Sequence, residues 1–110
     1  MPGLLDVYRQ YADTLAEGIK SLEAGLSANF DFQGKTYTLA DRVTLHSLYD
    51  LYVYRAAREA ILAGGQDITI VGRRFTRAQL GEIEKQIQRL EAGAARTERG
   101  GIRVRNAVPI

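Results

Sequence analysis

Residues 32–41 read FQGKTYTLAD and residues 70–79 read IVGRRFTRAQ. An alignment on Gly34 and Gly72, which lie 38 residues apart, matches residues of the same kind at six further positions. The matched pairs are Phe30 with Ile68, Phe32 with Ile70, Lys35 with Arg73, Tyr37 with Phe75, Thr38 with Thr76 and Ala40 with Ala78. The chain therefore contains an internal repeat, about residues 28–52 and 66–90.

Each copy of the repeat has the pattern of a β-hairpin. Two short runs of strand-forming residues flank a pair that ends in glycine, Gln33-Gly34 or Val71-Gly72, and glycine tolerates the positive φ that tight hairpin turns require. With two-residue loops, position 30 faces 37 and position 68 faces 75, so that one face of each hairpin is apolar. An isolated hairpin is at best marginally stable in water, so each should pack this face against helices.

Helices are predicted on both sides of each hairpin. Thr38 with Asp41 and Thr76 with Gln79 fit the capping box that begins a helix. The last helix has apolar residues at helical spacing and should end near Gly93. The middle helix, roughly residues 39–63, is apolar over a wide arc and should be the shared spine of both units. A first helix is indicated by apolar residues three or four positions apart, namely Leu4, Tyr8, Tyr11, Leu15, Ile19, Leu22 and Leu26.

These elements predict a mostly helical α+β fold in the order helix, hairpin, helix, hairpin, helix, with an extended C-terminal tail. Residues 1–99 should form a single compact domain, since a chain of 110 residues has no room for two. Residues 100–110 begin with two glycines and then alternate apolar and basic residues with the period of a strand. Because the tail contains no partner strand, we interpret it as flexible, and either frayed or docked on another chain. The candidate partner-binding residues are Ile102, Arg103, Val104, Arg105 and Val108.

Charge is unevenly distributed along the chain. The net charge is +2, but residues 1–65 carry six basic against eight acidic residues, and residues 66–110 carry nine against five. Arg73, Arg74 and Arg77 in the basic half are candidates for contact with DNA phosphates in a channel or with an acidic partner. The absence of cysteine, of a signal-peptide pattern and of a long apolar run predicts a protein outside membranes and without disulfides.

No catalytic, cofactor-binding or metal-binding pattern is found, so the chain is not expected to be an enzyme. His46 is the only histidine, and a metal site needs three or four converging ligands. His46 is therefore interpreted as a surface or interface residue. The segment QGKT leads into a strand and lacks the remaining glycine of a phosphate-binding loop.

The second unit, ILAGGQDITIVGRRFTRAQLGEIEKQIQRLEAG followed by GIRVR, resembles the gpW-like head-completion proteins of tailed bacteriophages. The resemblance covers roughly residues 58–105. It depends on the helix end at Gly64, the hairpin at Gly72, the helix start at Thr76, the apolar stripe from Leu80 to Leu90 and the arginines of the tail. The N-terminal helix and first hairpin are an addition to that pattern.

The resemblance implies a structural head-tail connector without catalytic activity or cofactor. It implies a homo-oligomeric ring, with about twelve copies, between the portal protein and the tail or next adaptor. The protein would be made in the host bacterial cytoplasm and located in the neck of the virion, where sequence-independent contact with packaged DNA is one use of its arginines. The alternative from the residues alone is a small nucleic-acid-binding or regulatory protein with a basic end.

Overall fold

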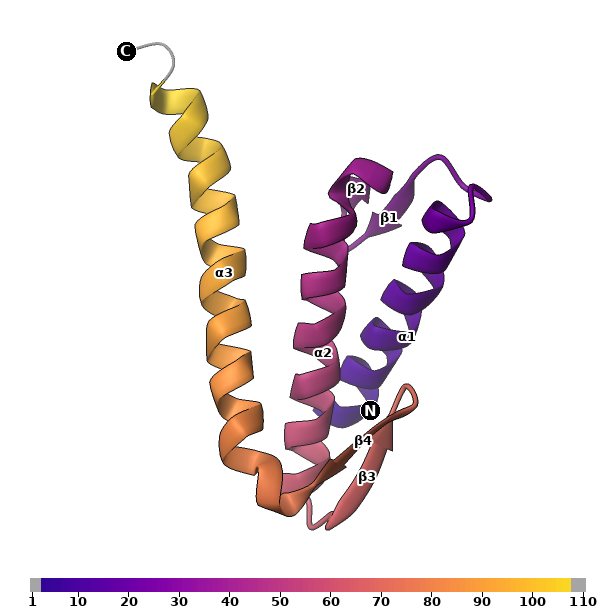
Figure 1. The fold of residues 1–110 in the computed structure, drawn as a ribbon, viewed down its shortest axis with the longest axis vertical. Helices are drawn as coiled ribbons and strands as arrows, with labels where there is room; N and C mark the ends of the chain where they lie inside the picture. Colours follow the sequence, from indigo (N-terminus) through magenta and orange to yellow (C-terminus); the bar gives the residue numbers. More distant parts are fainter. Residues whose placement is uncertain (1–2, 108–110) are drawn as a thin grey trace.

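The structure, a computed structural model, describes the backbone of residues 3–107 and the side chains of residues 3–93. Its elements confirm the predicted mostly helical α+β fold, in which three helices alternate with two antiparallel hairpins (Figure 1). In chain order they are α1 (Leu4–Glu23), β1 (Phe30–Phe32), β2 (Lys35–Tyr37), η1 (Leu39–Asp41), α2 (Arg42–Leu62), β3 (Asp67–Ile70), β4 (Arg73–Thr76), η2 (Arg77–Gln79) and α3 (Leu80–Ala107).

Both hairpins have the predicted register and two-residue loops. Phe30 is opposite Tyr37 in the first, and Ile68 is opposite Phe75 in the second. Both central residues of each loop have positive φ: 51° and 78° in the first loop, and 48° and 76° in the second. These are the angles of type I′ turns, whose twist matches that of the flanking strands.

The two predicted capping boxes begin the helices that follow the hairpins. The Thr38 backbone N–H donates to the Asp41 carboxylate at 2.9 Å, and the Thr76 N–H donates to Gln79 Oε1 at 2.8 Å. In each copy one 3-10 turn, η1 or η2, precedes the α-helix. The capping box that begins the next helix is therefore repeated along with the hairpin.

Helix α2 is the shared spine of the molecule, as predicted. It lies between α1 and α3 (Figure 1), and its neighbours along one turn, residues 51, 52 and 53, are all buried. A helix buried on several faces needs cover from more than one side. Its buried residues are Leu45, Leu51, Tyr52, Val53, Ala56, Ala57, Ala60 and Ile61.

The core repeats with the same period as the turns. Residues separated by 38 positions occupy equivalent buried places in the two units, so each helix-hairpin-helix unit packs its core in the same way. The equivalent buried pairs are Leu15 with Val53, Ile19 with Ala57, Leu22 with Ala60, Phe32 with Ile70, Tyr37 with Phe75 and Leu45 with Ile83.

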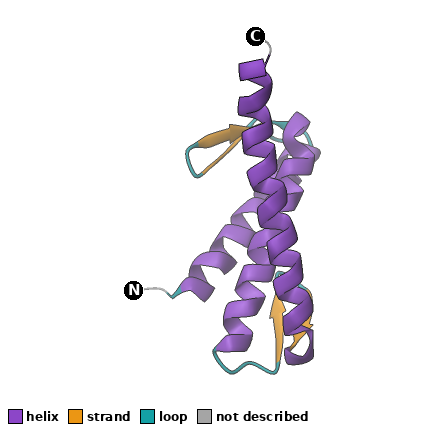
Figure 2. Cartoon of the chain, turned by 90° about the vertical axis from the view of Figure 1, so that its left-hand side faces the viewer, coloured by secondary structure: helices purple, strands orange, loops and turns teal. Residues whose placement is uncertain are grey.

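The two hairpins lie at opposite ends of α2. The β1–β2 hairpin is beside the first residues of α2, and the β3–β4 hairpin is beside its last residues (Figure 1). After a quarter turn of the molecule the two hairpins project to opposite sides of the helices (Figure 2). The duplication thus places two similar projections at opposite ends and on opposite faces.

The C-terminal part of the fold differs from the prediction. Helix α3 does not end near Gly93 but continues to Ala107, so the expected extended conformation of residues 100–107 is wrong. A glycine inside a helix costs only about 1 kcal/mol relative to alanine, and the residues after Gly93, AARTER, favour a helix. The helix also crosses the predicted boundary between domain and tail, at residues 99 and 100, without a break.

Candidate functional site

The β3–β4 hairpin and η2 carry the three arginines that the sequence analysis selected. Arg73 and Arg74 are neighbours on β4 and therefore point to opposite faces of the hairpin, while Arg77 begins η2. The structure brings them into one region of the molecule but gives each a different direction and a different partner.

Arg73 ties the hairpin to α2. Its Nη1 donates to Asp50 Oδ1 at 3.0 Å, and its Nη2 donates to the Tyr54 hydroxyl at 3.1 Å. The guanidinium also lies 5.0 Å from the centroid of the Tyr54 ring and 5.6 Å from that of Phe75. A planar cation held by a carboxylate, a hydroxyl and two aromatic rings has a fixed orientation, so Arg73 stiffens the hairpin.

Arg74 points outward and pairs with Asp67 on the adjacent strand. Its Nε lies 2.8 Å from Asp67 Oδ1, and a second nitrogen contacts the other carboxylate oxygen, so that the pair is bidentate. The hydrogen bond from Arg74 lowers the pKa of Asp67 below its usual value. The Arg74 side chain is still 73% exposed. It is the arginine of this group that a partner could reach most readily.

Arg77 is directed back to the end of α2. Its Nη1 donates to the Ile61 carbonyl at 3.2 Å, where the helix leaves its last carbonyls without intrahelical partners. All three arginines therefore have partners within the chain. Contact with DNA phosphates or with an acidic protein stays a prediction, and an incoming anion would compete with Asp50 and Asp67 for Arg73 and Arg74.

The tip of the β3–β4 hairpin combines strain with exposed apolar surface. Val71 has a φ of 48°, in the left-handed region that a β-branched residue rarely adopts, and its exposed fraction is 36%. The equivalent residue of the first hairpin is Gln33, which has nearly the same φ of 51°. The glycine of this turn was predicted from the sequence, but the strain at the valine was not.

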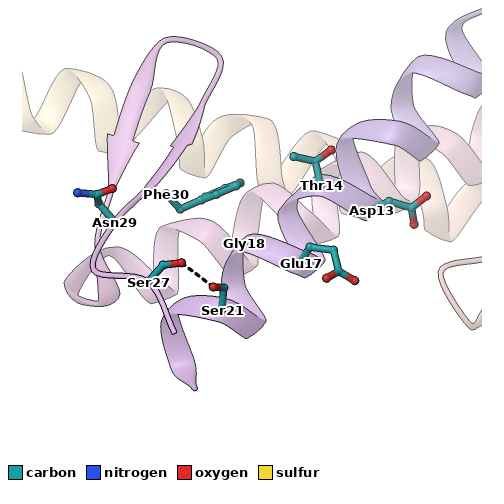
Figure 3. Close-up of a pocket in the computed structure, with 8 residues that line it drawn as sticks. All are labelled: Asp13, Thr14, Glu17, Gly18, Ser21, Ser27, Asn29 and Phe30. Atoms are coloured by element: carbon teal, nitrogen blue, oxygen red, sulfur yellow. Dashed lines mark hydrogen bonds between the residues drawn. The ribbon is translucent and has the colours of Figure 1, made fainter. Parts of the chain in front are cut away.

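A hollow of about 540 Å³ lies between α1 and the β1–β2 hairpin. The ring of Phe30 lies against Gly18 of α1 and forms its apolar wall (Figure 3). A Cβ on residue 18 would be 2.5 Å from the ring, so only glycine admits this contact. The Ser21 and Ser27 hydroxyls, 2.7 Å apart, close one end. Its lining residues are Asp13, Thr14, Glu17, Gly18, Ser21, Ser27, Asn29 and Phe30.

Two carboxylates on the wall of this hollow have no partner within the described side chains. Asp13 and Glu17 are one turn apart on α1, both are exposed, and neither has a hydrogen bond or ion pair in residues 3–93. Sequence reasoning missed this surface because residues 27–30 lie beside α1 only after the chain has turned back at the end of that helix. The only signal was Gly18, a glycine within an otherwise regular helical pattern.

Arg55 is a second residue that sequence reasoning missed. Its guanidinium lies 5.4 Å from the Tyr52 ring centroid and 5.8 Å from that of Tyr8, and its Nη2 contacts Glu91 Oε2 at 2.5 Å. It thus connects all three helices. The available signal was a single arginine within an apolar stretch of the middle helix, LYVYRAA.

His46 lies on the surface of α2. Its Nε2 is 3.1 Å from Glu23 Oε2 of α1, and the His46 side chain is 51% exposed. Within the described residues no group of three or more His, Cys, Asp or Glu side chains could hold a metal ion. In the same part of the chain no helix has the length and apolarity needed to cross a membrane.

The predicted partner-binding residues lie at the end of the chain. The backbone of residues 102–105 belongs to α3, so their docking as an added edge strand is not compatible with this conformation. Val108 lies outside the described residues. Binding of a partner by this segment stays a prediction. In the conformation seen here, residues 102–105 would bind as part of a helix and not as a strand.

Comparison with known proteins gives one match. A protein family described as "Family of unknown function (DUF6148)" matches residues 42–110, which cover α2, the β3–β4 hairpin and α3. No curated protein and no solved structure matches the chain. The matched region begins at the first residue of α2 and includes the whole second unit, more than half of the chain. This protein therefore belongs to the DUF6148 family of unknown function.

Proposed function

We propose that this protein is a structural head-tail connector of a tailed bacteriophage, which forms a ring between the portal protein and the tail or next adaptor. The observation that carries the proposal is the placement of two similar hairpins at opposite ends and on opposite faces of α2 (Figures 1 and 2). A subunit with two such projections can contact a different neighbour with each. That property suits a protein that must join other proteins.

The arrangement favours a ring over a symmetric pair. A contact between one end of a subunit and the other end of the next is heterologous, and heterologous contacts close into rings when the rotation between copies allows it. Arg73 pairs with Asp50 of α2 and so stiffens the β3–β4 hairpin. A stiff hairpin suits a repeated contact between the subunits of a ring.

The second unit is the part that resembles the gpW-like head-completion proteins. The resemblance spans about residues 58–105 and the DUF6148 match spans residues 42–110, so the two overlap on the β3–β4 hairpin and α3. The resemblance, and not the family match, assigns the connector fold to the second unit. The first unit adds another hairpin and another helix to it.

The composition of purified phage particles tests this proposal. If the protein is a neck connector, quantitative mass spectrometry of particles from the phage or prophage that encodes it should find this chain at about the copy number of the portal protein. Deletion of its gene should leave DNA-filled heads without tails. Absence of the chain from particles that carry both heads and tails would overturn the proposal.

A further inference from the structure

Val71 at the tip of the β3–β4 hairpin has two unfavourable features, a strained backbone and an exposed apolar side chain, that the fold does not require. A residue with a β-branched side chain is strained at a φ of 48°, and its apolar surface is partly exposed to water. The matched turn of the first hairpin has nearly the same φ, 51°, at the polar residue Gln33. The turn itself therefore has no need of valine, and strain of this kind is typical of contact sites.

The hairpin presents this tip rigidly. Arg73 fixes β4 to Asp50 and Tyr54 on α2, and Arg77 is bonded to the Ile61 carbonyl. The tip is thus an exposed apolar projection with little conformational freedom to lose on binding, which favours affinity. With Asp50 of α2, the ion-pair partner of Arg73, the same region has three arginines against two aspartates, a net charge of +1.

The hollow between α1 and the β1–β2 hairpin has the complementary properties. Phe30 and Gly18 offer an apolar surface, and Asp13 and Glu17 beside them are carboxylates without a partner in residues 3–93. No basic residue lines the hollow. It is therefore suited to an apolar tip flanked by basic residues.

We propose that the β3–β4 tip of one copy docks into the α1 hollow of a second copy, with Val71 on Phe30 and Arg74 near Asp13 and Glu17. The β1–β2 hairpin, whose Phe30 lines the hollow, and the β3–β4 hairpin lie at opposite ends of α2 and project to opposite sides of the helices (Figures 1 and 2). One chain therefore cannot fill its own hollow. The contact is heterologous and leaves a free hollow at one end of a pair and a free tip at the other end. The closure of successive contacts of this kind into a ring rests on the proposed function, whereas the contact between two copies does not.

Disulfide crosslinking tests this contact directly, because the natural chain contains no cysteine. Two variants of the full chain, Val71→Cys and Glu17→Cys, are mixed and oxidised, and the rate of heterodimer formation is measured. The matched control replaces Val71→Cys with Gln33→Cys, which places the thiol at the equivalent turn of the other hairpin. Docking should make the Val71 pair react at least about tenfold faster than the Gln33 pair, because the docked sites have a raised effective concentration.

A charge variant provides the second measurement. Asp13→Lys, introduced into the Glu17→Cys partner, should remove the preference for the Val71 thiol while circular dichroism shows an unchanged fold. Equal rates for the Val71 and Gln33 pairs, or a preference that survives the change at Asp13, would overturn the proposed contact.

The two proposals fail separately. A Val71 preference in the purified protein, together with absence of the chain from phage particles, would keep the contact between copies and remove the connector function. Presence of the chain in particles with equal crosslinking rates would keep the connector function and remove this contact.

Discussion

Val71 shows how a single turn residue can affect stability without contributing to the core. Asparagine fits the first central position of a type I′ turn better than valine, because it tolerates positive φ. We expect Val71→Asn to raise the free energy of unfolding by about 1 kcal/mol. Urea denaturation followed by circular dichroism measures this change. The matched variant Gln33→Asn should give a smaller gain, and an equal or lower stability of Val71→Asn would contradict the strain argument.

Asp67 offers a test of the outward ion pair on the second hairpin. Its pKa is lowered by the hydrogen bond from Arg74, so its ionised form is favoured in the folded state. A lowered pKa contributes stability above the pKa of the unfolded chain, and this contribution is lost as the pH falls through the folded value. Both groups are exposed, so the contribution should be small.

NMR titration of the Asp67 carboxyl checks this assignment. Arg74→Ala should raise the pKa of Asp67 toward its ordinary value, and added salt should do the same in the parent protein. Arg77→Ala is the control, because Arg77 contacts the Ile61 carbonyl and not Asp67. A pKa of Asp67 that stays low in Arg74→Ala would show that another group lowers it.

Sequence reasoning at the residue scale succeeded where the signal was local. Gly34, Gly72, Thr38 and Thr76 were correctly assigned to turns and helix starts, because the conformations that these residues favour are set by their own side chains. The partners of Arg73 and Arg77 could not be predicted. They lie on α2, and their distance from the arginines is fixed only when the hairpin packs on the helix.

At the scale of elements, the contact between α1 and the first hairpin depends on Gly18. In the parent protein Gly18→Ala should lower the free energy of unfolding, because the added Cβ would lie 2.5 Å from the Phe30 ring. In a Phe30→Ala background the same change should instead raise it by about 1 kcal/mol, the usual gain of alanine over glycine in a helix. Thermal or urea unfolding of the four proteins measures the coupling, and simple additivity of the two changes would contradict the contact.

The connection of the three helices through Arg55 gives a second test at this scale. Arg55→Ala removes the ion pair with Glu91 and the stacking on Tyr8 and Tyr52, and should lower the free energy of unfolding by about 1 to 3 kcal/mol. Arg58→Ala is the matched control on the same helix, since the ion pair of Arg58 is with its neighbour Glu59 at 3.9 Å. Equal effects of the two changes would mean that Arg55 does not join the helices.

The elements themselves were predicted well except at the C-terminal end. Hairpins and capping boxes have signals within a few residues, and the period of the apolar residues marks the helices. The end of α3 was placed at Gly93 because glycine often ends helices, but the helix passes through this residue to Ala107. The alternation from Ile102 to Arg105 is too short to distinguish a strand from a helix.

At the scale of the whole molecule, the duplication explains the architecture. Two helix-hairpin-helix units share α2, which is why this helix is buried on several faces and why its composition predicted a spine. The placement of the hairpins on opposite faces could not be predicted from the sequence, because it depends on the angles at which the three helices pack. The hollow beside Gly18 was missed for the same reason, since it exists only once Asn29 and Phe30 lie beside α1.

Electron cryo-microscopy of the protein assembled on its portal protein is the most direct test of the account. We expect a closed ring in which the Val71 tip of each copy is buried against the α1 surface around Gly18 of the next. A ring or a set of separate copies in which the β3–β4 tip is wholly exposed to solvent would contradict it.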